Sequence, residues 1–118
     1  MITSTPPTRV LPADIFDALE FSALVHGGIG ARQYFAQEDH RAPLCIIGHA
    51  CFLDGRDAPL GLSWSNSVGG VERAVRQLGL CIVHENDNAV DRLADSEDPD
   101  ARIPFDAWCQ ALGVVRGN

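Results

Sequence analysis

The chain has 118 residues, of which 46% are hydrophobic and 21% charged, a balance typical of one globular domain with its own core. Its nine basic residues are all arginine, which excludes a P-loop lysine, a lysine Schiff base and a lysine general base. Sixteen acidic residues give a net charge of −7, and residues 85–106 hold eight of them against two arginines. Such a surplus repels phosphates, so we expect no direct nucleic-acid binding.

The N-terminal residues 1–11 contain Pro6 and Pro7 and are expected to form an extended lead-in. They lack the basic region and apolar run of a signal peptide. No stretch of the chain reaches the roughly 18 apolar residues that a membrane helix requires. We therefore expect a cytoplasmic protein without membrane contact, in which residues 12–118 form a single helical domain.

The sequence of the first half of this domain predicts two helices. Pro12 opens a helix over Ala13–His26, which Gly27 and Gly28 end. Residues 29–42 mix aromatic and solvated side chains, as in a short hairpin or an irregular loop. Pro43 then precedes a very apolar run, residues 44–53, which predicts a buried central helix in which Gly48 and Ala50 allow a neighbouring segment to approach closely. The expected buried side of the first helix holds Ile15, Phe16, Leu19, Ala23 and Val25.

The second half predicts shorter elements. Residues 63–70 are expected to form a loop, with Ser67 as the N-cap of a helix over residues 68–78. A briefly extended stretch at residues 81–83 is followed by a helix that Asn86 or Asp87 caps and that ends at Ala94. An acidic loop over residues 95–100 leads to Pro104.

Pro104 begins a last helix over residues 104–112, which Gly113 ends. Its expected core side chains are Phe105, Trp108, Cys109 and Leu112. The predicted fold class is therefore mainly α, a compact single domain of four to five short helices with room for a small β-hairpin.

The segment Cys45-Ile46-Ile47-Gly48-His49-Ala50 resembles the Cys-aliphatic-aliphatic-Gly-x-Ala segment of a family of short uncharacterised helical proteins from high-GC bacteria and their phages. In that family the segment follows a glycine-containing turn, matched here by residues 27–30, and precedes a helix ending in Leu-Gly and an Asn-Asp pair, matched by Leu78-Gly79 and Asn86-Asp87. The resemblance covers roughly residues 15–95. Glu85 replaces the tryptophan expected before Asn-Asp. The resemblance implies a helical fold and a bacterial or phage origin, and it supplies no established activity to carry over to this chain.

Two sets of side chains are candidates for chemistry. Cys45 and His49, four residues apart on one helical face, combine with Cys81 and His84 into a Cys2His2 set of the kind that binds zinc. A thiol nucleophile is the second candidate, with Cys45 or Cys51 attacking, a histidine as base, and Asn86 or Asp87 orienting that base. The common alternative for such residues is a set of buried thiols and a hydrogen-bonded core histidine.

The acidic segment favours a different function, in which the protein acts without catalysis through protein–protein contact. Its carboxylates are expected to form an outward-facing surface for a basic protein, such as one that binds nucleic acid, with Trp64 as a neighbouring aromatic anchor. The common alternative is a solvated face that keeps the protein soluble. The expected partner-binding residues are Glu85, Asp87, Asp91, Asp95, Glu97, Asp98, Asp100 and Trp64.

The most concrete form of this function is an accessory protein or inhibitor of a phage or mobile element, of the anti-defence type, whose carboxylates imitate the charge of a nucleic acid. It needs no cofactor. The rival hypothesis is a small zinc-binding or cysteine-dependent enzyme that uses Cys45, His49, Cys81 and His84. The sequence leaves the oligomeric state open.

Overall fold

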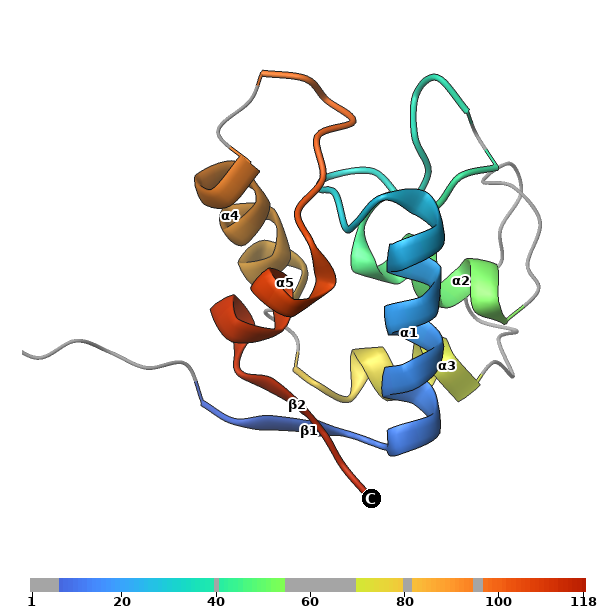
Figure 1. The fold of residues 1–118 in the computed structure, drawn as a ribbon, viewed down its shortest axis with the longest axis vertical. Coiled ribbons are helices and arrows are strands. Elements are labelled where there is room, and N and C mark those ends of the chain that lie inside the picture. The colour runs from blue at the N-terminus through green and yellow to red at the C-terminus, as the bar shows by residue number, and fades with distance from the viewer. Residues whose placement is uncertain (1–6, 40, 55–69, 80–81, 95–96) are drawn as a thin grey trace, which may run out of the picture.

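A computed structural model describes residues 7–39, 41–54, 70–79, 82–94 and 97–118. Within them the chain forms five helices and two short strands, which confirms the predicted mainly α fold (Figure 1). Among these residues no helix is long and apolar enough to cross a membrane. In chain order the elements are β1 (Arg9–Leu11), α1 (Ala13–His26), α2 (Ile46–Leu53), α3 (Gly70–Arg76), α4 (Ile82–Ala94), α5 (Phe105–Leu112) and β2 (Val114–Arg116).

Helix α1 lies in the middle of the fold, with the α2/α3 pair on one side and the α4/α5 pair on the other (Figure 1). It packs against α2, α3 and α5, while α4 packs mainly against α5. Its bounds are those predicted: Pro12 precedes it, and Gly27 ends it in the left-handed conformation at φ 85°. Leu19 and Ala23 are buried as expected, whereas Val25 is 59% exposed, so the predicted buried side was wrong at Val25.

The small sheet joins the first and last described elements. β1 and β2 run parallel, with Arg9 opposite Val114. Parallel strands need a long crossover, here formed by the helices between them, so this sheet is not a hairpin. The Arg9 guanidinium also donates to the backbone carbonyls of Leu78 and Leu112 and pairs with Glu85. The last part of the predicted lead-in is thus a strand bound to the folded domain.

Helix α2 forms the buried centre that the apolar run predicts. Residues 46–51 are all buried. A Cβ atom added at Gly48 would lie 1.7 Å from the backbone oxygen of Tyr34, so the loop over residues 29–42 crosses the helix at this glycine. This confirms the predicted close approach. The loop itself is irregular, with an antiparallel bridge between Phe35 and Pro43.

The elements after α2 differ in part from the prediction. Helix α3 lies within the predicted residues 68–78, while Ser67 is outside the described residues. Helix α4 starts at Ile82, so the extended stretch was wrong for residues 82–83. Asn86 and Asp87 consequently lie inside this helix and do not cap it.

Asn86 has a tertiary role that explains its position. It is fully buried, its Nδ2 donates to the Gly30 carbonyl at 2.9 Å, and its Oδ1 accepts from Trp108 Nε1 at 2.7 Å. A buried amide with both ends hydrogen-bonded ties α4 to α5 and to the turn after α1. Helix α5 has the predicted end at Gly113, and its four expected core side chains are buried.

Replacement of Gly48 by alanine tests the contact between α2 and the loop. Glycine to alanine normally stabilises a helix interior by about 1 kcal/mol. Here the new methyl group meets the Tyr34 carbonyl, which already accepts a hydrogen bond from the Leu44 amide at 2.8 Å. We expect Gly48→Ala to lower the free energy of unfolding by about 3 kcal/mol in urea titrations, with an unchanged m-value.

Gly70→Ala is the matched control, because a Cβ at Gly70 meets no atom of the described residues within 4 Å. It should leave stability unchanged or raise it by up to about 1 kcal/mol. Equal effects of the two substitutions would contradict the close approach at Gly48.

Candidate functional site

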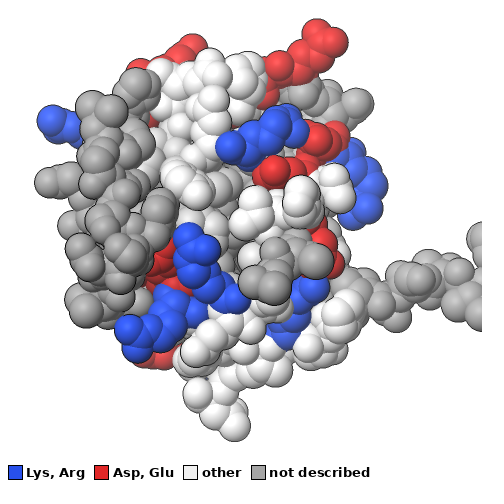
Figure 2. Space-filling model, turned by 180° about the vertical axis from the view of Figure 1, so that it is seen from behind, with Lys and Arg blue, Asp and Glu red and all other residues white. Residues whose placement is uncertain are grey.

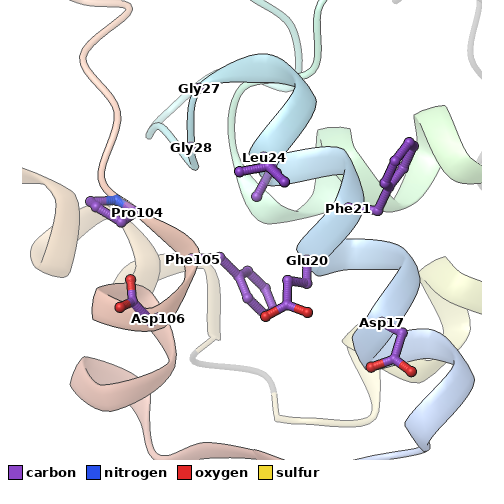
Figure 3. Close-up of a pocket in the computed structure, with 10 residues that line it drawn as sticks. Asp17, Glu20, Phe21, Leu24, Gly27, Gly28, Pro104, Phe105 and Asp106 are labelled. Carbon is purple, nitrogen blue, oxygen red and sulfur yellow. The ribbon is translucent and has the colours of Figure 1, made fainter.

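A groove lies between α1 and the beginning of α5 (Figure 3). Its volume is about 670 Å³, within the range of binding pockets for organic ligands or side chains of a partner. Figure 3 shows Leu24 and Glu20 projecting from α1 toward α5, with the Phe105 ring between the two helices. The lining residues are Asp17, Glu20, Phe21, Ala23, Leu24, Gly27, Gly28, Pro104, Phe105 and Asp106.

The α1 wall of the groove is apolar and unusually exposed. Leu24 is 79% exposed and Phe21 is 65% exposed, one helical turn apart. The Phe21 ring leaves α1 on the side away from α5 (Figure 3). Val25, four residues further along the helix, is 59% exposed and extends this apolar surface. Single exposed apolar side chains are ordinary, whereas a large contiguous apolar patch is typical of binding surfaces.

The floor of the groove is fixed by aromatic packing. Phe105 is 7% exposed, and its ring meets Phe16 edge-on with centroids 5.1 Å apart and stacks on Trp108 at 5.7 Å. Trp108 is held in turn by its hydrogen bond to Asn86. The floor is therefore held in place by three helices. The groove is already formed in the folded protein.

Three carboxylates border the groove. Asp17 is paired with Arg116 through two hydrogen bonds of 2.9 and 3.0 Å, which lower the pKa of its carboxyl. Asp106 accepts the amide hydrogen of Ala107 at the first turn of α5. Glu20, in contrast, has no hydrogen bond or ion pair within the described part of the chain, although its negative charge helps to raise the pKa of the nearby Arg116.

Cys109 on α5 shows that the charges of Glu20 and Asp106 act in one region. Burial raises the pKa of the Cys109 thiol to about 12, and the negative charges of Glu20 and Asp106 add to this increase. These two residues come from opposite walls of the groove (Figure 3). The groove therefore combines an apolar wall and floor with carboxylates at its border.

The glycine turn after α1 closes one end of the groove. Gly28 has a φ of 123°, and a Cβ at this position would lie 2.3 Å from the backbone oxygen of Ile103. The predicted role of Gly27 and Gly28 as a helix stop is confirmed. Their amides donate to the carbonyls of Leu24 and Ala23, at 3.4 and 2.6 Å, so they serve the helix end and are not directed toward a ligand.

His49 on α2 is hydrogen-bonded to this turn. It is fully buried, its Nε2 lies 3.1 Å from the Gly28 carbonyl, and its Nδ1 lies 2.7 Å from Ser22 Oγ. Because a carbonyl only accepts, Nε2 carries the proton and Ser22 donates to Nδ1. Burial, with the positive charge of Arg102 and the neighbouring His26, lowers the pKa of His49 to about 3. This serine–histidine pair is closed off from solvent and acts as a structural link.

The predicted zinc ligands are only partly placed by the structure. Cys45 and His49 lie at the start of α2, where the His49 amide donates to the Cys45 carbonyl at 3.0 Å. Both ring nitrogens of His49 already have protein partners. His84 is exposed on α4, and Cys81 lies outside the described residues. No group of three or more His, Cys, Asp or Glu side chains with metal-binding geometry occurs among the described residues. The zinc site stays a prediction.

The predicted thiol nucleophiles are buried. Cys45 is 3% exposed and Cys51 is fully buried. Burial also raises the pKa of the Cys45 thiol to about 11, which disfavours the thiolate that a nucleophile needs. The setting of both residues is that of core cysteines.

The acidic segment is bound to the rest of the molecule at several points. Glu85 pairs with Arg9, Asp91 pairs with Arg32, and Asp100 accepts the amide hydrogens of two loop residues. Figure 2 shows arginine and acidic side chains interspersed over one face of the molecule. Asp95 and Trp64 lie outside the described residues, while Asp87 and Asp98 accept backbone hydrogen bonds and Glu97 is exposed. Partner binding by this segment stays a prediction.

The groove was not identified from the sequence. Phe21 and Leu24 fall within the helix predicted over residues 13–26 without a predicted role, and Val25 was expected on its buried side. A weak signal was present, because α1 is apolar on more sides than one core can cover. Comparison of the chain with known protein families, curated proteins and solved structures found no match.

The buried His49 makes stability depend on pH. In the unfolded chain the imidazole takes up a proton near pH 6.5, whereas in the folded protein it stays neutral down to about pH 3. The unfolded state thus binds more protons in this window, and stability falls as the pH falls through it. Between pH 7 and pH 5 we expect the wild type to lose about 2 kcal/mol more than His49→Asn in urea unfolding.

His84→Asn is the control and should keep the full pH dependence, because His84 is exposed. In the folded wild type, NMR should show an imidazole that does not titrate between pH 5 and pH 8. Parallel stability curves for wild type and His49→Asn would contradict the buried neutral state.

Proposed function

We propose that this protein is a non-catalytic binding protein that captures a segment of another polypeptide in the groove between α1 and α5. The observation that carries this proposal is the exposed apolar wall of α1 above a rigid aromatic floor. A partner that covers Leu24 and Phe21 gains about 1.5–3 kcal/mol of binding free energy for each side chain that it removes from water. A preformed groove also reduces the ordering cost that binding must overcome.

The same features support binding over catalysis. Within the described residues, the histidine and cysteine side chains nearest the core are held by hydrogen bonds or by burial, as His49 and Cys45 illustrate. Among the described residues, the carboxylates around the groove lie beside apolar side chains. The Cys109 thiol on which Glu20 and Asp106 act is buried, and its pKa of about 12 disfavours the reactive thiolate. This arrangement suits a partner that presents apolar and polar side chains together.

The sequence also predicts that the protein acts through protein–protein contact. The binding surface proposed here is the groove and not the acidic segment. Ion pairs such as Glu85 with Arg9 reduce the charge that residues 85–106 present to a partner. An accessory or inhibitory role in a phage or mobile element remains compatible with binding through the groove, since it requires a target-binding surface and no active site.

Selection from a displayed library of helical peptides tests the proposal. We expect peptides that bind the wild type and lose at least about tenfold in affinity with Leu24→Asp, because a carboxylate then replaces an apolar contact at the centre of the interface. Affinities are measured by fluorescence anisotropy with the selected peptides. Leu24 is exposed, so urea unfolding should show that Leu24→Asp keeps its stability.

Leu93→Asp is the matched control, a leucine of α4 that is 47% exposed and outside the groove lining. It should leave peptide binding unchanged. If no selected peptide depends on Leu24, the proposal fails. If sedimentation shows a wild-type dimer that Leu24→Asp dissociates, the groove is a self-association surface and the heterologous partner is excluded.

A further inference from the structure

We infer that the occupant of the groove is an amphipathic helix that places a cationic side chain against Glu20, next to an apolar side chain on Leu24. This inference rests on the proposed function and specifies the chemistry of the partner. It follows from three properties of the groove. They are a carboxylate without an ion pair, the spacing of that carboxylate from Leu24 on the same helix, and main-chain groups that are already hydrogen-bonded within the helices.

The three carboxylates around the groove differ in how far they are already engaged by other residues. The carboxylate of Asp17 is occupied by Arg116, which binds both of its oxygens. Asp106 is partly engaged by the amide of Ala107. Glu20 lies one turn from Asp17 and Leu24 and has no hydrogen bond or ion pair within the described residues. Its charge acts on Arg116 only at a distance, so Glu20 is the carboxylate to which a cation can still bind directly.

The negative potential at this position is reinforced from the opposite wall. Glu20 and Asp106 both raise the pKa of the buried Cys109 thiol, so the two charges act on the same part of α5, beside the groove. A second carboxylate on the partner would meet like charges beside apolar surface, where water screens them less than in bulk solvent. The groove therefore selects for arginine or lysine and against aspartate or glutamate.

The spacing on α1 matches a helical partner. Glu20 and Leu24 are four residues apart, so their side chains are neighbours on one face at about 6 Å. A helix packed against α1 presents side chains at the same interval, one above Glu20 and the next above Leu24. Two residues of the partner, one cationic and one apolar at positions i and i+4, are enough to satisfy both.

The backbone around the groove disfavours an extended partner. Strand addition needs unpaired main-chain donors and acceptors along an edge, and both walls of this groove are helices whose main-chain groups bond within the helix. At the glycine turn, the Gly28 carbonyl accepts from His49 and Arg102, and the Gly28 amide donates to Ala23. The groove thus recognises side chains, as in helix-in-groove recognition.

Two synthetic helical peptides provide the test. Both carry leucines at i, i+4 and i+7, and they differ in the residues flanking this stripe, which are arginine in one peptide and glutamate in the other. We expect the arginine peptide to bind the wild type at least about tenfold more tightly than the glutamate peptide at low salt, and the difference to shrink at high salt. Fluorescence anisotropy measures both affinities.

Variants at Glu20 assign the preference to this side chain. Glu20→Gln should weaken binding of the arginine peptide about fivefold, and Glu20→Arg should reverse the preference so that the glutamate peptide binds more tightly. Glu38→Gln removes an exposed carboxylate outside the groove lining and should change neither affinity. Urea unfolding of each variant checks that the fold is retained.

The outcomes separate this inference from the proposed function. If both peptides bind equally and both depend on Leu24, the groove binds helices but the cationic preference is wrong. If the peptide library yields Leu24-dependent binders that lack arginine and lysine, the same conclusion follows. If neither designed peptide binds and the library yields no Leu24-dependent binder, the proposed function itself is wrong.

Discussion

The fold depends on the turn formed by residues 27–30, whose buried backbone groups bind α2, α4 and the segment before α5. The Gly28 carbonyl accepts hydrogen bonds from His49 on α2 and from Arg102 before α5. Ile29 pairs with Ile103 through both backbone bonds, and the Gly30 carbonyl accepts from Asn86 on α4. A buried backbone group without a partner is costly, so each of these elements must be in place for the turn to be stable.

This turn also determines the shape of the groove. Helix α1 ends at the turn and α5 begins just after Ile103, so the Ile29–Ile103 bridge holds the two walls at a fixed separation. The missing side chain at Gly28 permits this approach, since a Cβ would collide with the Ile103 carbonyl. The groove is a consequence of core construction and exists before a partner binds. Its apolar wall then remains uncovered because α5 diverges from α1 beyond this point (Figure 1).

Local signals were sufficient to predict several elements, and tertiary contacts explain the errors. Proline before α1 and α5 and glycine after them mark helix ends by backbone preferences that act within a few residues. The Asn86-Asp87 pair has the composition of a helix cap, but burial of Asn86 between Gly30 and Trp108 places it inside α4. The parallel pairing of β1 with β2 joins residues about a hundred positions apart and leaves no periodic pattern in three-residue strands. Helix α1 has apolar residues on most of its sides. Its sequence therefore does not indicate which of these sides the core leaves exposed.

The distribution of charge along the chain is likewise a poor guide to its distribution over the surface. Arg9, Arg32 and Arg116 come from segments of modest net charge, yet they pair with Glu85, Asp91 and Asp17, far away in sequence. Exposed pairs of this kind contribute little to stability, but they cancel the local field that an approaching partner would sense. The field at a binding surface is therefore determined by the carboxylates that remain unpaired beside apolar surface. Glu20 meets this condition through the fold alone, since nothing in its sequence neighbourhood distinguishes it from other helical glutamates.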